Sequence, residues 1–157
     1  MDPIRCGNEC YVPLSAFING QGEEFYAPVP AYPSGHATFG AAAFHIVRRF
    51  YGVGADDRSP DAPFQDLTFV SDEHNGVNKD NNGTVRPKHV RDFPNGLWQM
   101  IEENSLSRIY LGVHWSFDGF VIDSGGMPDF TQNIGGVSLG INIANNIFDT
   151  GMTKSTV

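Results

Sequence analysis

The clearest periodic pattern along the chain is a run of small and apolar residues between positions 34 and 51. These residues recur at the spacing of one helical face: Ala37, Gly40, Ala41, Phe44, Val47 and Tyr51. Ser34 can cap the first turn, and Arg48 and Arg49 suit the negative end of the helix dipole in the last turn. The pattern therefore predicts a helix from Ser34 to Tyr51, with a Gly–Ala face that permits close packing against another helix.

Two further stretches have helical spacing. The first runs from Phe93 to Gly112, with Asp92 or Asn95 as a cap and Pro94 in the first turn. Its apolar contacts are expected from Leu97, Trp98, Ile101, Leu106 and Leu111. The second runs from 137 to 148 and ends near Gly151. Its expected core stripe consists of Leu139, Ile143 and Ile147, broadened by Ile141 and Ala144.

Loops are expected to make up much of the remaining chain, which contains 18 glycines and 10 prolines in all. Prolines and glycines divide residues 1–32, so this segment is expected to be an irregular strap that leads to Ser34. The stretch 67–82 is mixed in character, and the run 75–83 has the composition of a surface turn.

Length and charge narrow the class of protein. The 157 residues are 40% hydrophobic, which suits one soluble domain, and the net charge of −8 disfavours nucleic acid or an anionic membrane as a partner. No apolar run approaches the length of a membrane span, and no signal-peptide core is present. Cys6 and Cys10 form an isolated C-x3-C pair that permits a local disulfide, so the compartment stays open.

The triplet Ser34-Gly35-His36 places candidate chemistry at the start of the first predicted helix. Free backbone N–H groups at a helix N-terminus favour an anion. A hydroxyl, a flexible amide and an imidazole there would form an oxyanion cradle with a proton donor. An ordinary capped helix with an exposed histidine explains the triplet alone equally well.

The densest chemistry follows the second predicted helix, in the segment 107–118. On one straight helix Arg108 and His114 would point about 120° apart, but Gly112 permits a break that lets His114 open a new helix and face the same pocket. Asp118 lies four residues after His114, where its carboxylate can hold one imidazole nitrogen and leave the other free as nucleophile or ligand. The alternative is a buried His–Asp pair with a surface arginine.

The other three histidines show no ligand spacing. His45 is expected to be partly packed within the first helix, and His74 and His89 are expected to be solvated. No H-E-x-x-H or equivalent pattern links any of the histidines, which makes a zinc site improbable.

Together, Ser-Gly-His and S-R-x-x-x-G-x-H-x-x-x-D form a much more specific signal. The sequence resembles the vanadium-dependent haloperoxidases, of the fungal chloroperoxidase type, within the superfamily of type 2 phosphatidic acid phosphatases and bacterial acid phosphatases. The segments that carry the resemblance are PAYPSGHATFGAAAFHIVRRFYG, NGVNKD, ENSLSRIYLGVHWSFD and IGGVSLGINIANNIF. The resemblance implies an all-α, loop-rich helix-bundle fold, with residues 1–157 as the C-terminal catalytic portion of a larger domain. It is also consistent with secretion or a periplasmic location.

The resemblance also implies a cofactor and a role for each motif residue. His114 would ligate vanadate, Asp118 would orient His114, and His36 would be the acid–base group. Arg108, the Ser34 hydroxyl and the Gly35 amide would hydrogen-bond the oxide oxygens. The substrates would be hydrogen peroxide and a halide, and hypohalous acid would react with a small organic acceptor. Vanadium would act as a Lewis acid without a change of oxidation state.

Two other functions remain open. In an acid phosphatase of the same superfamily, His114 would attack phosphorus and His36 would protonate the leaving oxygen, and the two motifs do not separate these reactions. The third possibility is an inactive helical remnant that binds oxyanions weakly. The family's upstream K-x6-R-P motif is absent, so we expect a truncated chain, or one whose apolar faces are covered by a partner segment or a second copy. Val29 stands where chloride-oxidising relatives have phenylalanine, which favours bromide over chloride.

Overall fold

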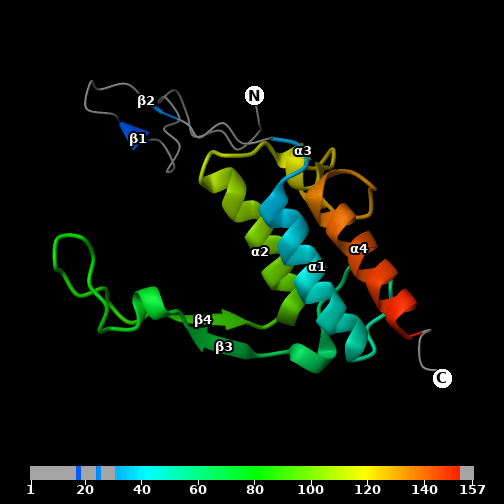
Figure 1. Ribbon diagram of the computed structural model, residues 1–157, viewed down its shortest axis with the longest axis horizontal. Helices are drawn as coiled ribbons and strands as arrows, with labels where there is room; N and C mark the ends of the chain where they lie inside the picture. The colour runs from blue at the N-terminus through cyan, green and yellow to red at the C-terminus, as the bar shows by residue number, and fades with distance from the viewer. Residues whose placement is uncertain (1–16, 19–23, 26–30, 153–157) are drawn as a thin grey trace.

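The computed structural model describes residues 17–18, 24–25 and 31–152, and helices make up about half of this part (Figure 1). The α-helices are α1 (Gly35–Phe50), α2 (Gly96–Tyr110), α3 (Ser116–Gly119) and α4 (Gly135–Met152). Two short 3-10 helices, Ala62–Phe64 and Asp72–His74, lie between α1 and α2. In Figure 1, α1 lies between α2 and α4; it runs antiparallel to α2 and parallel to α4.

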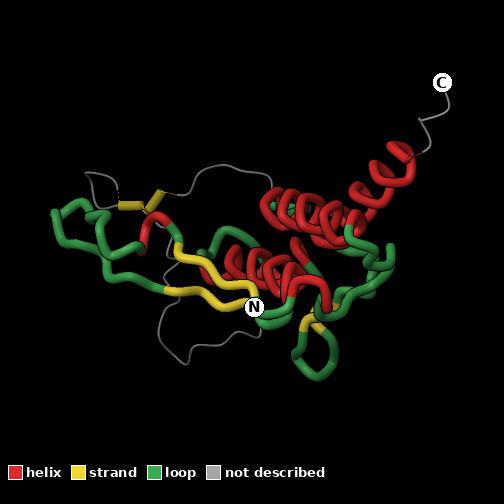
Figure 2. The backbone as a smooth tube through the Cα atoms, turned by 90° about the horizontal axis from the view of Figure 1, so that it is seen from below, coloured by secondary structure: helices red, strands yellow, loops and turns green. Residues whose placement is uncertain are grey.

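Three short antiparallel strand pairs accompany the helices. They are β1 (Phe17–Ile18) with β2 (Glu24–Phe25), β3 (Leu67–Val70) with β4 (Val90–Phe93), and β5 (Val121–Ile122) with β6 (Pro128–Asp129). The β3–β4 pair and its loop project to one side of the helices (Figure 2). The expected all-α class is therefore correct only in its coarser part, a mostly helical bundle. Each strand has at most four residues, so a period-two pattern is too short to detect.

Glycines of α4 bring its backbone against α1. A Cβ atom on Gly136 would lie 2.4 Å from the carbonyl oxygen of Ser34, and one on Gly140 would lie 2.3 Å from that of Thr38. The expected close helix packing is thus confirmed, but on the α1 side the contact is made by Thr38 and Ala41. Gly40 of α1 instead faces α2.

One core cluster joins the helices. Its buried members are Ala37, Ala41, Trp98, Ile101, Ile109, Phe120, Phe130, Val137 and Ile141. On α4 the core residues are Val137, Ile141 and Ala144, whereas Leu139, Ile143 and Ile147 are exposed. The predicted α4 stripe was therefore wrong at Leu139, Ile143 and Ile147, whereas Ile141 and Ala144 are buried as expected. This helix has apolar residues on two faces, and the glycines that dock on α1 decide which face is buried.

Exposure also differs from expectation at the end of α1. Val47 is 38% exposed and Tyr51 60% exposed, although both belonged to the predicted apolar face. The predicted bounds of α1 are confirmed: Ser34 is its N-cap and accepts a hydrogen bond from the Ala37 N–H, and Tyr51 is its C-cap.

Helix α2 begins later than predicted and receives its cap from elsewhere. Pro94 precedes the helix, and Asn95 occupies the N-cap position without a side-chain capping bond. Instead, Asp61 accepts a hydrogen bond of 2.8 Å from the Trp98 N–H through Oδ2. The predicted cap failed because a distant loop, rather than a neighbouring residue, satisfies the free N–H groups of the first turn.

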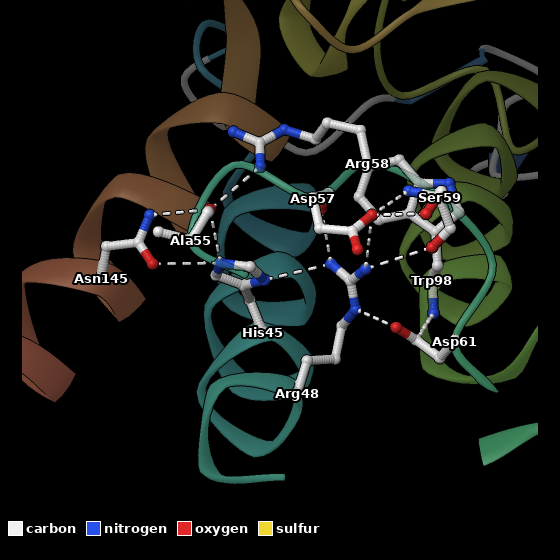
Figure 3. A network of polar contacts seen from close by, with 9 residues as sticks. All are labelled: His45, Arg48, Ala55, Asp57, Arg58, Ser59, Asp61, Trp98 and Asn145. Carbon is white, nitrogen blue, oxygen red and sulfur yellow. Dashed lines mark hydrogen bonds and ion pairs between the residues drawn. The ribbon is translucent and has the colours of Figure 1, made fainter. Parts of the chain in front are cut away.

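Asp61 belongs to a buried polar network at the end of α1 (Figure 3). Its Oδ1 accepts a hydrogen bond of 2.7 Å from Nε of Arg48, whose side chain is fully buried and lies over the Trp98 ring. Arg48 also donates to the carbonyls of Asp57 and Ser59. Arg48 is therefore an internal link between α1, the following loop and α2, rather than a solvated charge at the helix terminus.

His45 extends the same network to α4. Its Nδ1 lies 3.1 Å from an Arg48 nitrogen, and its Nε2 lies 3.1 Å from both the Ala55 carbonyl and Asn145 Oδ1. His45 is fully buried, so it is packed more completely than expected, while His74 and His89 are exposed as predicted.

Within the described residues, no helix combines the length and hydropathy that a membrane crossing requires.

Candidate active site

The N-terminus of α1 is attached to the segment that carries His114 and Asp118. Ser34 is fully buried, and its N–H donates a hydrogen bond of 2.8 Å to the Asp118 carbonyl. The Ser34 hydroxyl oxygen accepts from the Ala37 N–H at 3.3 Å, and its carbonyl accepts from the Thr38 hydroxyl at 2.9 Å. Two motifs that are about 80 residues apart in sequence therefore meet at the upper end of α1 in Figure 1.

Gly35 and His36 form the exposed first turn of α1. Among the described residues, a Cβ atom on Gly35 would meet only the Phe39 ring, at 3.9 Å, so none of them fills the space beside this amide. The His36 side chain is exposed, while its backbone carbonyl accepts a 2.8 Å hydrogen bond from Nδ2 of Asn104 on α2.

Arg108, in the last turn of α2, lies within electrostatic reach of His36. Its positive charge is the largest cause of a lowered His36 pKa, to which burial and the nearby His114 also contribute. Burial lowers the pKa of Arg108 itself. Its Nε is buried without a hydrogen-bond partner among the described residues. The fold thus brings His36, Arg108 and His114 within electrostatic reach of one another and leaves a guanidinium donor unused.

His114 and Asp118 form a shielded pair. Nδ1 of His114 lies 3.2 Å from Oδ2 of Asp118, and the two side chains are 6% and 0% exposed. The same carboxylate oxygen accepts a bond of 2.9 Å from the Trp115 N–H. A carboxylate beside Nδ1 holds the proton on that nitrogen, which leaves Nε2 as the ring nitrogen with a free lone pair.

The predicted break before His114 is present, but the element that follows differs. Gly112 has a positive φ of 72° directly after α2, a conformation that favours glycine. His114 does not open α3, which begins at Ser116. The His114–Asp118 contact therefore bridges a turn into the short helix, rather than linking two residues on one helical face as predicted.

The donor set suits an oxyanion such as vanadate. Anions are bound by guanidinium groups and by the free N–H groups of a helix N-terminus, and Arg108 and α1 supply these here. Among the described residues, no group of three or more His, Cys, Asp or Glu side chains is arranged to hold a metal ion. A single imidazole, together with a guanidinium whose Nε has no partner among the described residues, fits an oxyanion that takes one nitrogen ligand.

Asn104 and Asp61 were missed by the sequence analysis, although both position site elements. Asn104 lies on the same helix as Arg108 and contacts the first turn of α1, while Asp61 caps the opposite end of that helix. The available signal for Asn104 was Gly40, a glycine inside a predicted helix that indicates close approach of a neighbour. Cys6, Cys10 and Val29 lie outside the described residues, so predictions about them stay predictions.

The comparisons with known proteins agree with the motifs. The family described as the VCPO second helical-bundle domain matches residues 9–127, which include both motif segments. The vanadium chloroperoxidase of Curvularia inaequalis is 38% identical over 180 aligned residues, covering 82% of this chain and 29% of the relative. The chain therefore spans less than a third of that relative's length.

Proposed function

The chain belongs to the vanadium chloroperoxidase family, and on this premise we propose that it is the vanadate-holding part of a haloperoxidase that oxidises halide with hydrogen peroxide. The observation that carries the proposal is the convergence of His36, Arg108 and the His114–Asp118 pair, with Nε of Arg108 buried and unpartnered among the described residues. Residues 1–157 would then be the C-terminal catalytic portion of the larger domain.

Each motif residue has a role that its environment supports. Nε2 of His114 would hold vanadate, because Asp118 occupies the other ring nitrogen. Arg108 would compensate the negative charge of the oxide oxygens, and the Ser34 hydroxyl and Gly35 amide would donate to them at the positive end of α1. Vanadate, when bound, would supply Lewis-acid polarisation of hydrogen peroxide.

His36 would be the acid–base group. Arg108 lowers its pKa, so its exposed imidazole is neutral near pH 7 and ready to accept a proton from incoming hydrogen peroxide. The protonated ring can then return that proton to a leaving oxygen. The halide, bromide more readily than chloride, and a small organic acceptor would complete the reaction.

The same residues would serve two other functions. An acid phosphatase would use Nε2 of His114 as a nucleophile, and an inactive remnant would bind oxyanions without turnover. No observation on the described residues favours either, so vanadate enters the experiment both as required cofactor and as inhibitor.

The test is vanadate binding and bromination of a phenolic dye by the full chain, measured beside phosphate-ester hydrolysis. We expect vanadate-dependent bromination in the wild type, and His114→Ala to weaken vanadate binding by about 10²-fold or more, because the ligand is lost. His89→Ala is the matched control, since His89 is exposed on a distant loop.

Vanadate-inhibited hydrolysis without bromination would support the phosphatase, and vanadate binding without either reaction would support the remnant. If His114→Ala binds vanadate as tightly as the wild type, the assignment of the site is wrong.

A further inference from the structure

Asn104 joins the helix of Arg108 to the helix of His36. Its Nδ2 donates a hydrogen bond of 2.8 Å to the backbone carbonyl of His36, across 68 residues of sequence. The side chain fits because Gly40 lies opposite: a Cβ atom there would lie 2.3 Å from Nδ2 and 3.0 Å from Cγ of Asn104. Asn104 and Gly40, one on each helix, thus form a tether: a polar contact between α2 and the first turn of α1 that adds to the packing of the core.

The tether lies one helical turn away from the candidate site. Helices α1 and α2 run in opposite directions, and α2 continues past Asn104 toward the N-terminal end of α1 (Figure 1). Arg108 follows Asn104 by four residues, which is about 6 Å along the axis. The hydrogen bond from Asn104 to the His36 carbonyl therefore fixes the position of Arg108 along the helix axis relative to the first turn of α1.

The low helix propensity of Gly40 and Asn104 supports a role beyond packing. Glycine is among the weakest helix formers and asparagine is a poor one, yet each lies inside a long helix at the same contact. Local choices that oppose helix formation tend to mark positions chosen for function.

We propose that Asn104 is a positioning residue that holds His36 in register with Arg108, so that an imidazole and a guanidinium face the same oxyanion. Hydrogen bonds to an oxyanion weaken when donors shift by fractions of an ångström, so a slide of α1 along α2 would reduce binding without removing any motif residue. The inference rests on the proposed function, since the oxyanion is the vanadate assigned above.

The test approaches the contact from both helices. Asn104→Ala removes the donor, whereas Gly40→Ala keeps it but places a Cβ atom where Nδ2 lies, while improving the helix propensity of α1. We expect each variant to weaken orthovanadate binding by about three- to tenfold, the range of one lost hydrogen bond. The double variant should bind orthovanadate no more weakly than the more affected single variant, because both changes break the same contact.

Asn142→Ala is the matched control. Asn142 lies on α4, donates an amide hydrogen bond of 3.1 Å to Asn133, and changes helix propensity by the same amount when replaced. We expect the control to bind orthovanadate as the wild type does. Urea unfolding of all variants provides the stability scale, and equal stability loss in Asn104→Ala and Asn142→Ala with unequal affinity would support positioning.

Crystal structures of the two site variants separate this inference from the proposed function. Superposed on α2, the first turn of α1 should be displaced in Asn104→Ala and Gly40→Ala, whether or not the chain binds vanadate. A wild type that does not bind vanadate overturns the proposed function, and the displacement still decides whether the tether sets the register. Undisplaced α1 turns, or an Asn104→Ala variant with wild-type affinity, would overturn the positioning role.

Discussion

At the scale of single residues, the pKa of His36 is lowered more by a neighbouring charge than by burial. It is exposed, yet Arg108 on another helix lowers its pKa more than desolvation does. The resemblance to the vanadium-dependent haloperoxidases predicted both residues as members of one site, and the structure places them within electrostatic reach. Their roles toward an oxyanion stay proposals.

Replacing Arg108 tests this coupling. We predict that Arg108→Met raises the pKa of His36 toward its ordinary value, because the charge that opposes the imidazolium is removed. The measurement is an NMR titration of the ring proton shifts without added oxyanion. Arg91→Met, on the distant strand β4, should leave the His36 pKa unchanged, and an unchanged value in Arg108→Met would contradict the geometry.

At the scale of elements, Asp61 connects two helices through one carboxylate. Oδ1 accepts from Arg48 near the end of α1, and Oδ2 accepts from the first turn of α2. Because α1 and α2 carry the site at their other ends, this link orients both helices from the far side. Residue spacing along α2 gave no sign of it, since the cap comes from 37 residues away.

Removing the Asp61 carboxylate should destabilise the fold strongly. We predict that Asp61→Ala lowers the free energy of unfolding by about 3–5 kcal/mol, because Arg48 would remain buried without its close, fully buried partner and would keep only the partly exposed Asp57 carboxylate, at 4.0 Å. Chemical denaturation measures the change. Glu73→Ala is the matched control: Glu73 is 77% exposed and pairs with Arg86 at 3.6 Å, so its loss should change stability by about 1 kcal/mol at most. Equal effects would show that the buried pair contributes no special stability.

At the scale of the whole molecule, the buried network joins α1, the following loop and α4 through one histidine. Burial and then the charge of Arg48 lower the pKa of His45, and Arg58 contributes in the same direction. The hydrogen bonds to Asn145 and Ala55 oppose this shift without reversing it. A neutral His45 is thus built into the folded state.

The fold should therefore lose stability in mild acid. The unfolded chain binds a proton at His45 near pH 6.5, whereas the folded chain binds it only at lower pH. The neutral ring therefore contributes its full stability above about pH 6.5, and this stability is lost as the pH falls. We predict that the free energy of unfolding declines between pH 7 and 5 less steeply in His45→Gln than in the wild type. His74→Gln, an exposed control, should follow the wild type, and identical slopes in all three would contradict the prediction.

The molecule also exposes apolar faces that the bundle does not use. Leu139, Ile143 and Ile147 on α4 and Phe39 and Phe50 on α1 are between 38% and 76% exposed. Patches of this kind are common at interfaces, so the expected cover by a partner segment or a second copy stays a prediction.

The sequence by itself determined where the three long helices form. Helical periodicity and the Ser34 cap predicted α1, because both are local properties of the chain. Two motifs proposed the residues of the candidate site through their resemblance to the vanadium-dependent haloperoxidases, since each chemical role requires a particular residue type.

Only the tertiary structure decided which apolar face of α4 is buried, which residue caps α2 and where the strands pair. The buried side of α4 depends on its contact with α1 through Gly136 and Gly140, and the α2 cap depends on a loop that folds back. Strand β3 finds its partner 20 residues later. These features depend on contacts between residues that are distant in sequence, so no local sequence pattern predicts them.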